Sequence, residues 1–327
     1  MTDRTGAAPD RFGVVVIGRN EGERLRRCLA SLAEVAAPLV YVDSGSSDSS
    51  VALAASMGAV VVELDMATAF SAARARNAGW RELLARWPHL EFVQFVDGDC
   101  EVASGWLTSA CAFLGKNFRA AAVCGRRKER FPEQSVYNRA CDAEWDTPIG
   151  KAEACGGDAM FRASALCRTG GFNPAILAGE EPEFCARLRG LGFVIWRLDA
   201  PMTLHDAAMT KFSQWWIRAR RSGFGYAQAF VATRADAAPL YRSELKRAGV
   251  WAGMLPLVSA AGGVLLHPAF LGLLPLAMAS QIVRLHKRFG WSRAGLLTIG
   301  KFAELQGILG YLCNRKIHGN SAAMTYK

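Results

Sequence analysis

The sequence predicts an α/β fold: a mostly parallel, Rossmann-like sheet flanked by helices, followed by an apolar helical segment near the C-terminal end. Two observations lead to this prediction. Between residues 13 and 97, short runs of β-branched residues alternate with stretches of helical spacing, which is typical of parallel sheets with right-handed crossovers. Between residues 250 and 283 the chain is nearly uncharged, over a length that suits helices in a membrane.

Four strands are expected in the N-terminal part, each followed by a helix or a polar loop. They cover residues 13–17, 39–42, 59–64 and 92–96. The last of them, FVQFV, has the β-branched and aromatic composition of an interior strand. Helices are expected at 24–35, from 51 to 57 and at 70–87, with Gly58 and Pro88 as natural stops.

Two carboxylates, Asp97 and Asp99, directly follow the fourth strand with one glycine between them. Ligands of open α/β sheets bind at the carboxyl ends of the strands. Paired carboxylates at that place suit a hard divalent cation, which would hold a phosphate-bearing substrate. A simple turn is the alternative interpretation, because Asp-Gly is a good turn pair.

Other polar residues follow strands at the same expected edge. Asn20 and Glu21 come after the first strand. Asp43 comes after the second, where it can accept a hydrogen bond from a base or ribose, or begin an Asx turn that caps the next helix; both can hold. Further on, Glu181 lies among three glutamates at a helix start, as a general base or as a complement to the helix dipole.

Charge and cysteine usage narrow the classes of protein. The 327 residues carry a formal net charge of +10, but the basic residues are dispersed, so nucleic-acid binding is not expected. The run from 126 to 130 reads as a solvated basic face. Nine cysteines without a CxxC pair indicate buried thiols in a reducing compartment. No signal peptide is visible in the first eleven residues, so the catalytic part is expected in the cytosol.

Seven short motifs, in this order, resemble those of the family 2 glycosyltransferases, which have the GT-A fold. They are IGRNE (17–21), VDSGSSD (42–48), ARNAG (75–79), VDGDCE (96–101), GGDAMFR (156–162), GGF (170–172) and GEEPEFCARLRGLG (179–192). Each motif is weak alone, but seven at family-like spacing make the resemblance specific over roughly residues 13–225.

The resemblance implies an inverting, metal-dependent transfer of a sugar from a nucleotide-sugar donor to an acceptor hydroxyl. In the matching positions, Asp43 is expected to contact the nucleoside. Asp97 and Asp99 form the DxD pair, with Asp99 on Mn²⁺ or Mg²⁺. Glu181 is expected to be the catalytic base, and His205 to contact the metal ion or the diphosphate.

Donor-binding residues are expected in the same motifs and on a later helix. They are Asn20, Glu21, Asp43, Arg76, Asp97, Gly157, Arg218 and Arg221, and the expected metal ligands are Asp97, Asp99 and His205. Arg218 and Arg221 share a helix face with Gln214, and their charges suit a leaving diphosphate.

Three departures from the family pattern bear on the reaction. Ser44 stands where a second Asp is common, and Glu181 replaces the Asp of the base position, which lengthens its reach by one methylene. The QWWIR segment resembles the QxxRW motif of processive synthases only loosely, which favours single addition. A nucleotidyltransferase and a non-catalytic, membrane-bound saccharide-binding protein are the alternatives.

The expected organisation is a tail at 1–11, a GT-A domain at 12–232 and a helical, membrane-associated region at 233–327. Because both flanks of the apolar segment are basic, a hairpin broken near residues 266–268 is expected, with two helices of about 16 residues. A buried or oligomeric helical pair is the alternative. The expected place is the cytoplasmic face of the plasma membrane, and the expected acceptor is a saccharide, free or lipid-linked, in surface polysaccharide or glycolipid assembly.

Overall fold

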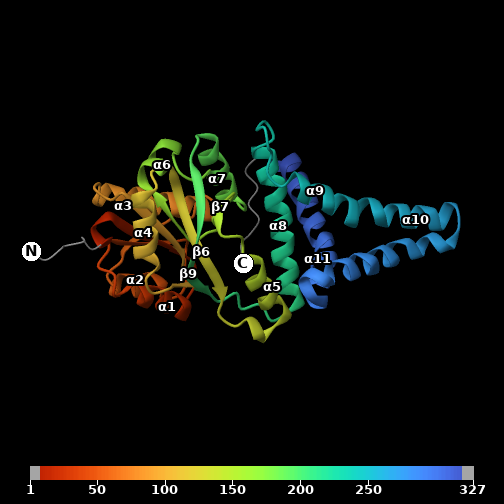
Figure 1. Ribbon diagram of the computed structural model, residues 1–327, viewed down its shortest axis with the longest axis horizontal. Coiled ribbons are helices and arrows are strands. Elements are labelled where there is room, and N and C mark those ends of the chain that lie inside the picture. The colour runs from red at the N-terminus through yellow and green to blue at the C-terminus, as the bar shows by residue number, and fades with distance from the viewer. Residues whose placement is uncertain (1–7, 319–327) are drawn as a thin grey trace, which may run out of the picture. The chain divides into compact units, whose positions relative to one another are not determined.

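The computed structural model describes residues 8–318, which form two compact units. The first unit comprises the chain up to Phe131 together with Cys141–Ala207. The second comprises Pro132–Ala140 together with the chain from Ala208 onward. The sheet and its flanking helices belong to the first unit, and the long C-terminal helices belong to the second (Figure 1).

One nine-stranded sheet organises the first unit, in the order β3-β2-β1-β4-β8-β6-β9-β5, with β7 paired to β9. The strands are β1 (Phe12–Gly18), β2 (Leu39–Asp43), β3 (Val60–Glu63), β4 (Phe92–Asp97), β5 (Cys100–Val102), β6 (Ala120–Glu129), β7 (Gly150–Ala152), β8 (Ala159–Arg162) and β9 (Val194–His205). The first four run parallel, as predicted. The other half is mixed, because β8 is antiparallel to both β4 and β6.

The helices of this unit lie between the strands in the sequence and flank the sheet in space (Figure 1). They are α1 (Glu23–Leu32), α2 (Ser50–Ser56), α3 (Ala72–Arg86), α4 (Trp106–Lys116), α6 (Ala163–Thr169) and α7 (Glu180–Gly190), with the short η1 (Ala8–Arg11) before β1. At Gly79, α3 approaches the sheet so closely that an added Cβ would meet the side chains of Val15 and Val42. The expected helices at 24–35, 51–57 and 70–87 are confirmed, and each ends one to three residues before the expected position.

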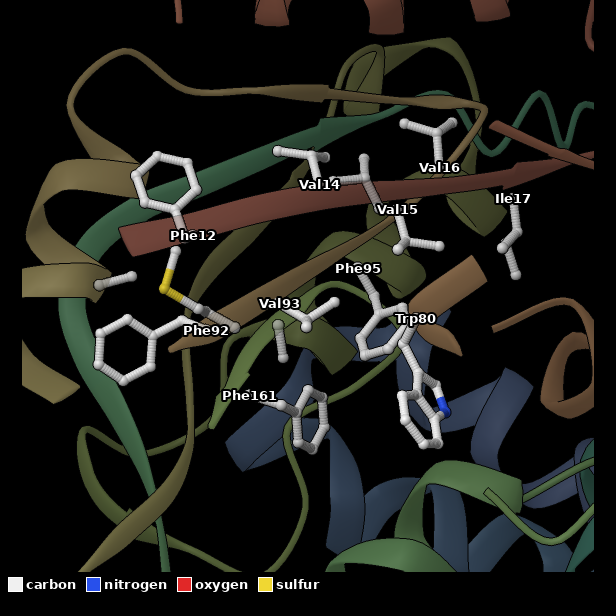
Figure 2. Packing of buried hydrophobic residues seen from close by; sticks show 14 of the residues in the cluster. Phe12, Val14, Val15, Val16, Ile17, Trp80, Phe92, Val93, Phe95 and Phe161 are labelled. Atoms are coloured by element: carbon white, nitrogen blue, oxygen red, sulfur yellow. The ribbon is translucent and has the colours of Figure 1, made fainter. Parts of the chain in front are cut away.

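The core lies where β1 and β4 pair. Val14, Val15 and Val16 are almost completely buried, as the β-branched run predicts. Figure 2 shows the rings of Phe95 and Phe161 close together below these strands, and their centroids are 5.7 Å apart in an edge-on arrangement. The carboxylates Asp97 and Asp99 therefore follow a strand that is packed on both sides by buried apolar side chains.

The second unit is helical, and two of its helices, α8 and α11, pack closely at glycine residues. Its elements are η2 (Pro132–Gln134), part of α5 (Val136–Trp145), α8 (Phe212–Ala232), α9 (Arg242–Ala248), the π-helix η3 (Gly249–Met254), α10 (Leu255–Leu265), η4 (Pro268–Gly272) and α11 (Leu273–His318). Gly223 of α8 lies against the backbone of Glu304, and Gly307 of α11 lies against that of Arg220. This close packing groups α8 with the C-terminal helices, whereas the predicted division fell at residue 232.

A break in the apolar segment occurs where the sequence predicts it. Helix α10 ends at Leu265, and Pro268 begins the next turn, where its missing N–H costs little. The ring of His267 caps that turn by accepting a hydrogen bond from the N–H of Ala269 at 3.2 Å. The side chains of Phe270 and Leu271 lie against Gly262 and Gly263 of α10. The helical runs before and after the break, called the two arms below, therefore lie side by side up to the tip at residues 264–268 (Figure 1).

Both arms are longer than the two helices of about 16 residues that the sequence suggests. The helical run Arg242–Leu265 has 24 residues, and Pro268–Lys316 has 49 with a non-helical residue at Gly290. By length and composition, both can cross a membrane. Their apolar windows are hardly buried within the protein itself.

Candidate active site

The parallel strands bring the predicted polar residues to one edge of the sheet. In the registers, Gly18 pairs with Asp43, and Ile17 pairs with Asp97. The N–H of Gly98 also donates to the carbonyl of Ile17 at 2.8 Å. The loops after β1, β2 and β4 therefore begin side by side, as expected for the carboxyl ends of a parallel sheet.

Asp43 is almost fully buried and organises the loop that follows it. Its Oδ2 accepts the N–H groups of Gly45 and Ser46 at 2.9 and 2.7 Å, which is the predicted Asx turn. Its Oδ1 accepts the hydroxyls of Tyr41 and Ser46 at 3.0 and 2.5 Å. The predicted capping of the next helix does not occur, since α2 begins after Ser49.

The loop after β1 is tied to the loop after β2. Asn20 has a positive φ of 55°, and its side-chain oxygen accepts the N–H of Ser47 at 2.7 Å. The backbone N–H of Asn20 donates to the hydroxyl of Ser46 at 2.9 Å. Glu21 forms an ion pair with Arg24 at 2.6 Å. The two loops are thus joined by hydrogen bonds into one wall beside the DxD pair.

Asp97 lies in a buried network of opposite charges. Its Oδ1 is 2.8 Å from Nη2 of Arg76, whose Nη1 is 2.7 Å from Oε1 of Glu180. Its Oδ2 is 3.4 Å from Nη2 of Arg127, which is 2.6 Å from Oδ2 of Asp158. Burial raises the pKa of Asp97 and of Glu180, although Arg76 opposes the shift for both.

Gly157 lies directly against this network. A Cβ at that position would be 2.7 Å from both Nη2 of Arg76 and Oδ2 of Asp97, so no larger residue fits without displacing the pair. Asp158, next to it, accepts the N–H of Asp97 at 2.9 Å. The predicted donor-binding residues Arg76, Asp97 and Gly157 are therefore in mutual contact.

Asp99 has a different surrounding, formed by His205. Strand β5 pairs with β9, and this brings Oδ2 of Asp99 to 3.4 Å from Nε2 of His205. Burial by itself would raise the pKa of Asp99 and lower that of His205. Their mutual hydrogen bond and charge outweigh it, so the pKa of Asp99 lies below its usual range and that of His205 rises to about 9.

The far side of the His205 ring faces a second carboxylate. Its Nδ1 is buried, has no hydrogen-bond partner among residues 8–318, and lies 3.8 Å from Oε2 of Glu129. Strand β6 places Glu129 directly opposite His205, and the edge of the Trp145 ring packs against the imidazole. A carboxylate behind a histidine is the arrangement that orients metal-bound imidazoles. Asp99 and His205 therefore fit a divalent cation that accepts both oxygen and nitrogen ligands.

Glu181 is held by the loop before β8. Its exposed fraction is only 6%. One oxygen, Oε1, accepts the N–H of Cys155 at 2.6 Å and the thiols of Cys155 and Cys185 at 3.1 and 2.9 Å. Of the neighbouring glutamates, Glu183 pairs with Arg187 at 2.7 Å on the same helix. The three glutamates at this helix start thus have three different surroundings.

The structure adds residues that the sequence did not single out. Arg127 and Glu129 come from the basic run at 126–130, which is not the solvated face expected, because Arg126, Arg127 and Arg130 all form ion pairs. Asp158 stands inside the GGDAMFR motif, which was a usable signal. Cys185 stands inside the GEEPEFCARLRGLG motif, one helical turn after Glu181, and so also had a signal, whereas Cys155 had none. Arg218 and Arg221 lie on α8 in the second unit, and their donor-binding role stays a prediction.

Comparison with known proteins agrees with this geometry. The sequence model of the family described as "Glycosyl transferase family 2" matches residues 13–164, which include β1 to β4 and the DxD pair. Residues 13–164 belong to glycosyl transferase family 2. The chain therefore carries a family 2 glycosyltransferase domain with a GT-A-type sheet, as its motifs suggested.

The likeness in fold to one solved structure extends beyond the matched residues. A mannosyltransferase from Pyrobaculum calidifontis, solved with GDP-Man and Mn²⁺, is similar over 93% of this chain and 88% of its own, with a TM-score of 0.65 and 17% identity. S. aureus TarS 1-349 is similar over 92% of this chain and 89% of its own, with a TM-score of 0.48 and 15% identity.

A curated relative covers only a short part of the chain. A TPR repeat-containing protein of Synechococcus elongatus is 42% identical over 69 residues, which is 21% of this chain. The match spans 17% of that relative's own length.

Proposed function

We propose that this glycosyltransferase moves a sugar from a nucleotide-sugar donor to an acceptor hydroxyl, in a single, inverting, metal-dependent step. The observation that carries the proposal is the pair of Asp99 and His205 at the carboxyl ends of the strands, apart from the Arg76-bound Asp97. Imidazole beside carboxylate favours Mn²⁺ over Mg²⁺, which prefers oxygen ligands alone. The Mn²⁺ in the structure of the Pyrobaculum mannosyltransferase supports the same ion.

Different residues of this chain would bind the cation, position Asp97 and bind the nucleoside. When bound, the cation would neutralise charge on the leaving diphosphate. Asp99 and His205 would hold it, while Arg76 and Arg127 fix Asp97 and the turn after β4. The wall formed by Asn20 and the Asp43 loop would receive the nucleoside.

Glu181 would take the proton from the acceptor hydroxyl. All hydrogen bonds found to its carboxylate fall on Oε1, and within the described residues none is found to Oε2. One oxygen is thus fixed in place while the other remains for the proton, which suits a general base. Glu180 is less suited, because its carboxylate is already paired with Arg76.

The experiment that tests this function is a donor screen with product analysis. UDP-, GDP-, CMP- and dTDP-sugars are incubated with the full chain, with and without Mn²⁺, and GDP-mannose is tried first. We expect release of a nucleoside diphosphate that requires Mn²⁺ and is stimulated by the acceptor. Pyrophosphate release from a nucleoside triphosphate would instead indicate a nucleotidyltransferase. Sugar binding without any turnover would indicate the non-catalytic alternative.

We further propose that the apolar arms insert into the membrane from its cytoplasmic side and bring the enzyme next to a lipid-linked saccharide. Leucine and valine residues at the tip are largely exposed: Val264 is 83% exposed, Leu265 77% and Leu266 74%. Such a patch is rare on a protein surrounded by water alone. Basic residues flank the arms: Arg242, Lys246 and Arg247 before them, and Arg284, Lys287 and Arg288 after them.

The lengths favour a hairpin that enters and returns. Between the tip and the nearest basic residue, Arg247 or Arg284, the uncharged part of each arm has about 16 to 18 residues. Its length is roughly 24 to 27 Å, compared with about 30 Å for the hydrocarbon of a bilayer. The tip carries no charged residue that could anchor it in the opposite headgroups. Both basic flanks then remain at the anionic cytoplasmic surface, which attracts them.

Cysteine labelling tests this topology. After the exposed Cys167 and Cys313 are replaced by serine, single cysteines are introduced as Arg247→Cys, Arg288→Cys and Val264→Cys. We expect the first two to react only from the cytoplasmic side, in inverted vesicles but not in intact cells. Val264→Cys should react only after detergent is added. Labelling of one flank from outside would show a true crossing, and release of the protein by carbonate would show that nothing inserts.

A further inference from the structure

A buried cluster of two thiols and one carboxylate joins α7 to the loop before β8. Cys185 follows Glu181 by one helical turn, and Cys155 comes from the loop between β7 and β8. Their sulfur atoms are 3.6 Å apart, and both lie within hydrogen-bonding reach of Oε1 of Glu181. The backbone N–H of Cys155 adds a third donor at 2.6 Å.

We infer that Cys155 and Cys185 are positioning residues for the proposed base: their thiols hold Oε1 of Glu181 so that Oε2 faces the acceptor hydroxyl. The inference rests on the proposed function and adds to it the groups that orient the base. A glutamate has one more rotatable bond than the aspartate common at this position, so it needs more contacts to hold one orientation.

The thiols are in the protonated form that this role requires. Burial raises the pKa of Cys155 well above its usual value and raises that of Cys185 to about 11. Both sulfur atoms therefore carry a proton near neutral pH that they can donate to the carboxylate oxygen. The same burial makes them poor nucleophiles.

The loop that carries Cys155 also reaches the other half of the site. Gly156 has a positive φ of 80°, which turns the chain immediately after Cys155. Gly157 then lies against Asp97 and Arg76. Three consecutive residues thus connect the base to the network behind the DxD pair, so the cysteines set the base relative to the donor site.

The test compares alanine and serine at each cysteine. Cys155→Ala and Cys185→Ala should each lower kcat about three- to tenfold, because a donor to a charged group is lost, while the KM for the donor stays unchanged. Cys155→Ser and Cys185→Ser keep a hydroxyl donor of similar size and should recover most of the rate. Cys111→Ala, at a buried cysteine of α4 outside the site, is the matched control and should behave as the parent. The thermal unfolding midpoint is measured for every variant.

Four outcomes would overturn the inference. They are parental kcat in both folded alanine variants, serine variants as slow as the alanine variants, a loss confined to KM, and a bound zinc ion in the purified protein that disappears with either cysteine. Glu181→Gln separates this inference from the proposed function. If that variant is inactive while the cysteine variants act as the parent, only the positioning role fails. If it turns over as the parent, the assignment of the base itself fails.

Discussion

Replacing Glu181 by glutamine is expected to lower kcat by about two to four decades, the usual scale for removing a general base. The amide keeps the size of the side chain and can still accept hydrogen bonds at one atom, but it cannot take the proton of the acceptor hydroxyl. Donor affinity should stay close to that of the parent, because the residues assigned to the donor come from other loops. Single-turnover transfer and calorimetric donor binding, measured on the same preparation, give both quantities.

Two neighbouring glutamates supply the controls for this result. Glu183→Gln removes the ion pair with Arg187 and should affect stability more than chemistry. Glu180→Gln removes a partner of Arg76 and should weaken donor binding, since Arg76 also holds Asp97. Near-parental turnover of Glu181→Gln, together with a loss of several decades at one of these two positions, would move the role of base to that residue.

Asp99→Asn is expected to abolish the dependence of nucleoside diphosphate binding on a divalent cation. The substitution removes the negative charge that lies beside His205 and leaves a neutral amide, a poor ligand in place of a carboxylate. The fold should persist, because the core on which β4 rests consists of apolar residues away from this side chain. Titration with UDP and GDP, in Mn²⁺ and in EDTA, measures the effect.

An exposed carboxylate on β9 gives the matched control for that experiment. Asp199→Asn changes the same net charge on the strand that carries His205, but it lies outside the site and should bind as the parent does. Equal nucleotide affinity of the Asp99 variant and the parent, whether or not EDTA is present, would show that Asp99 holds no metal ion. Circular dichroism of each variant excludes a loss of fold as the cause.

Much of the fold and part of the site could be predicted because they follow from local patterns. A β-branched run with a polar end predicts a strand and its carboxyl terminus, and parallel topology places such ends together. For that reason Asn20, Asp43 and Asp97 were expected at one edge, and the registers confirm that edge. The break at His267 and Pro268 was predictable in the same way, since proline restricts the chain locally.

What the sequence by itself determined is therefore the position of strands β1 to β4 along the chain and their parallel direction, the family-like motifs at their ends and the position of the apolar arms. The tertiary structure alone decided which side chains surround each carboxylate. Arg127 and Glu129 looked like part of a solvated run, and Cys155 lies 26 residues from Glu181, to which it donates. The packing of α8 on α11 depends likewise on glycines far apart in the chain. Such contacts have no local signature, because they arise only when strands β8 and β9 join the sheet, helix α7 packs beside them, and the buried charges find partners there.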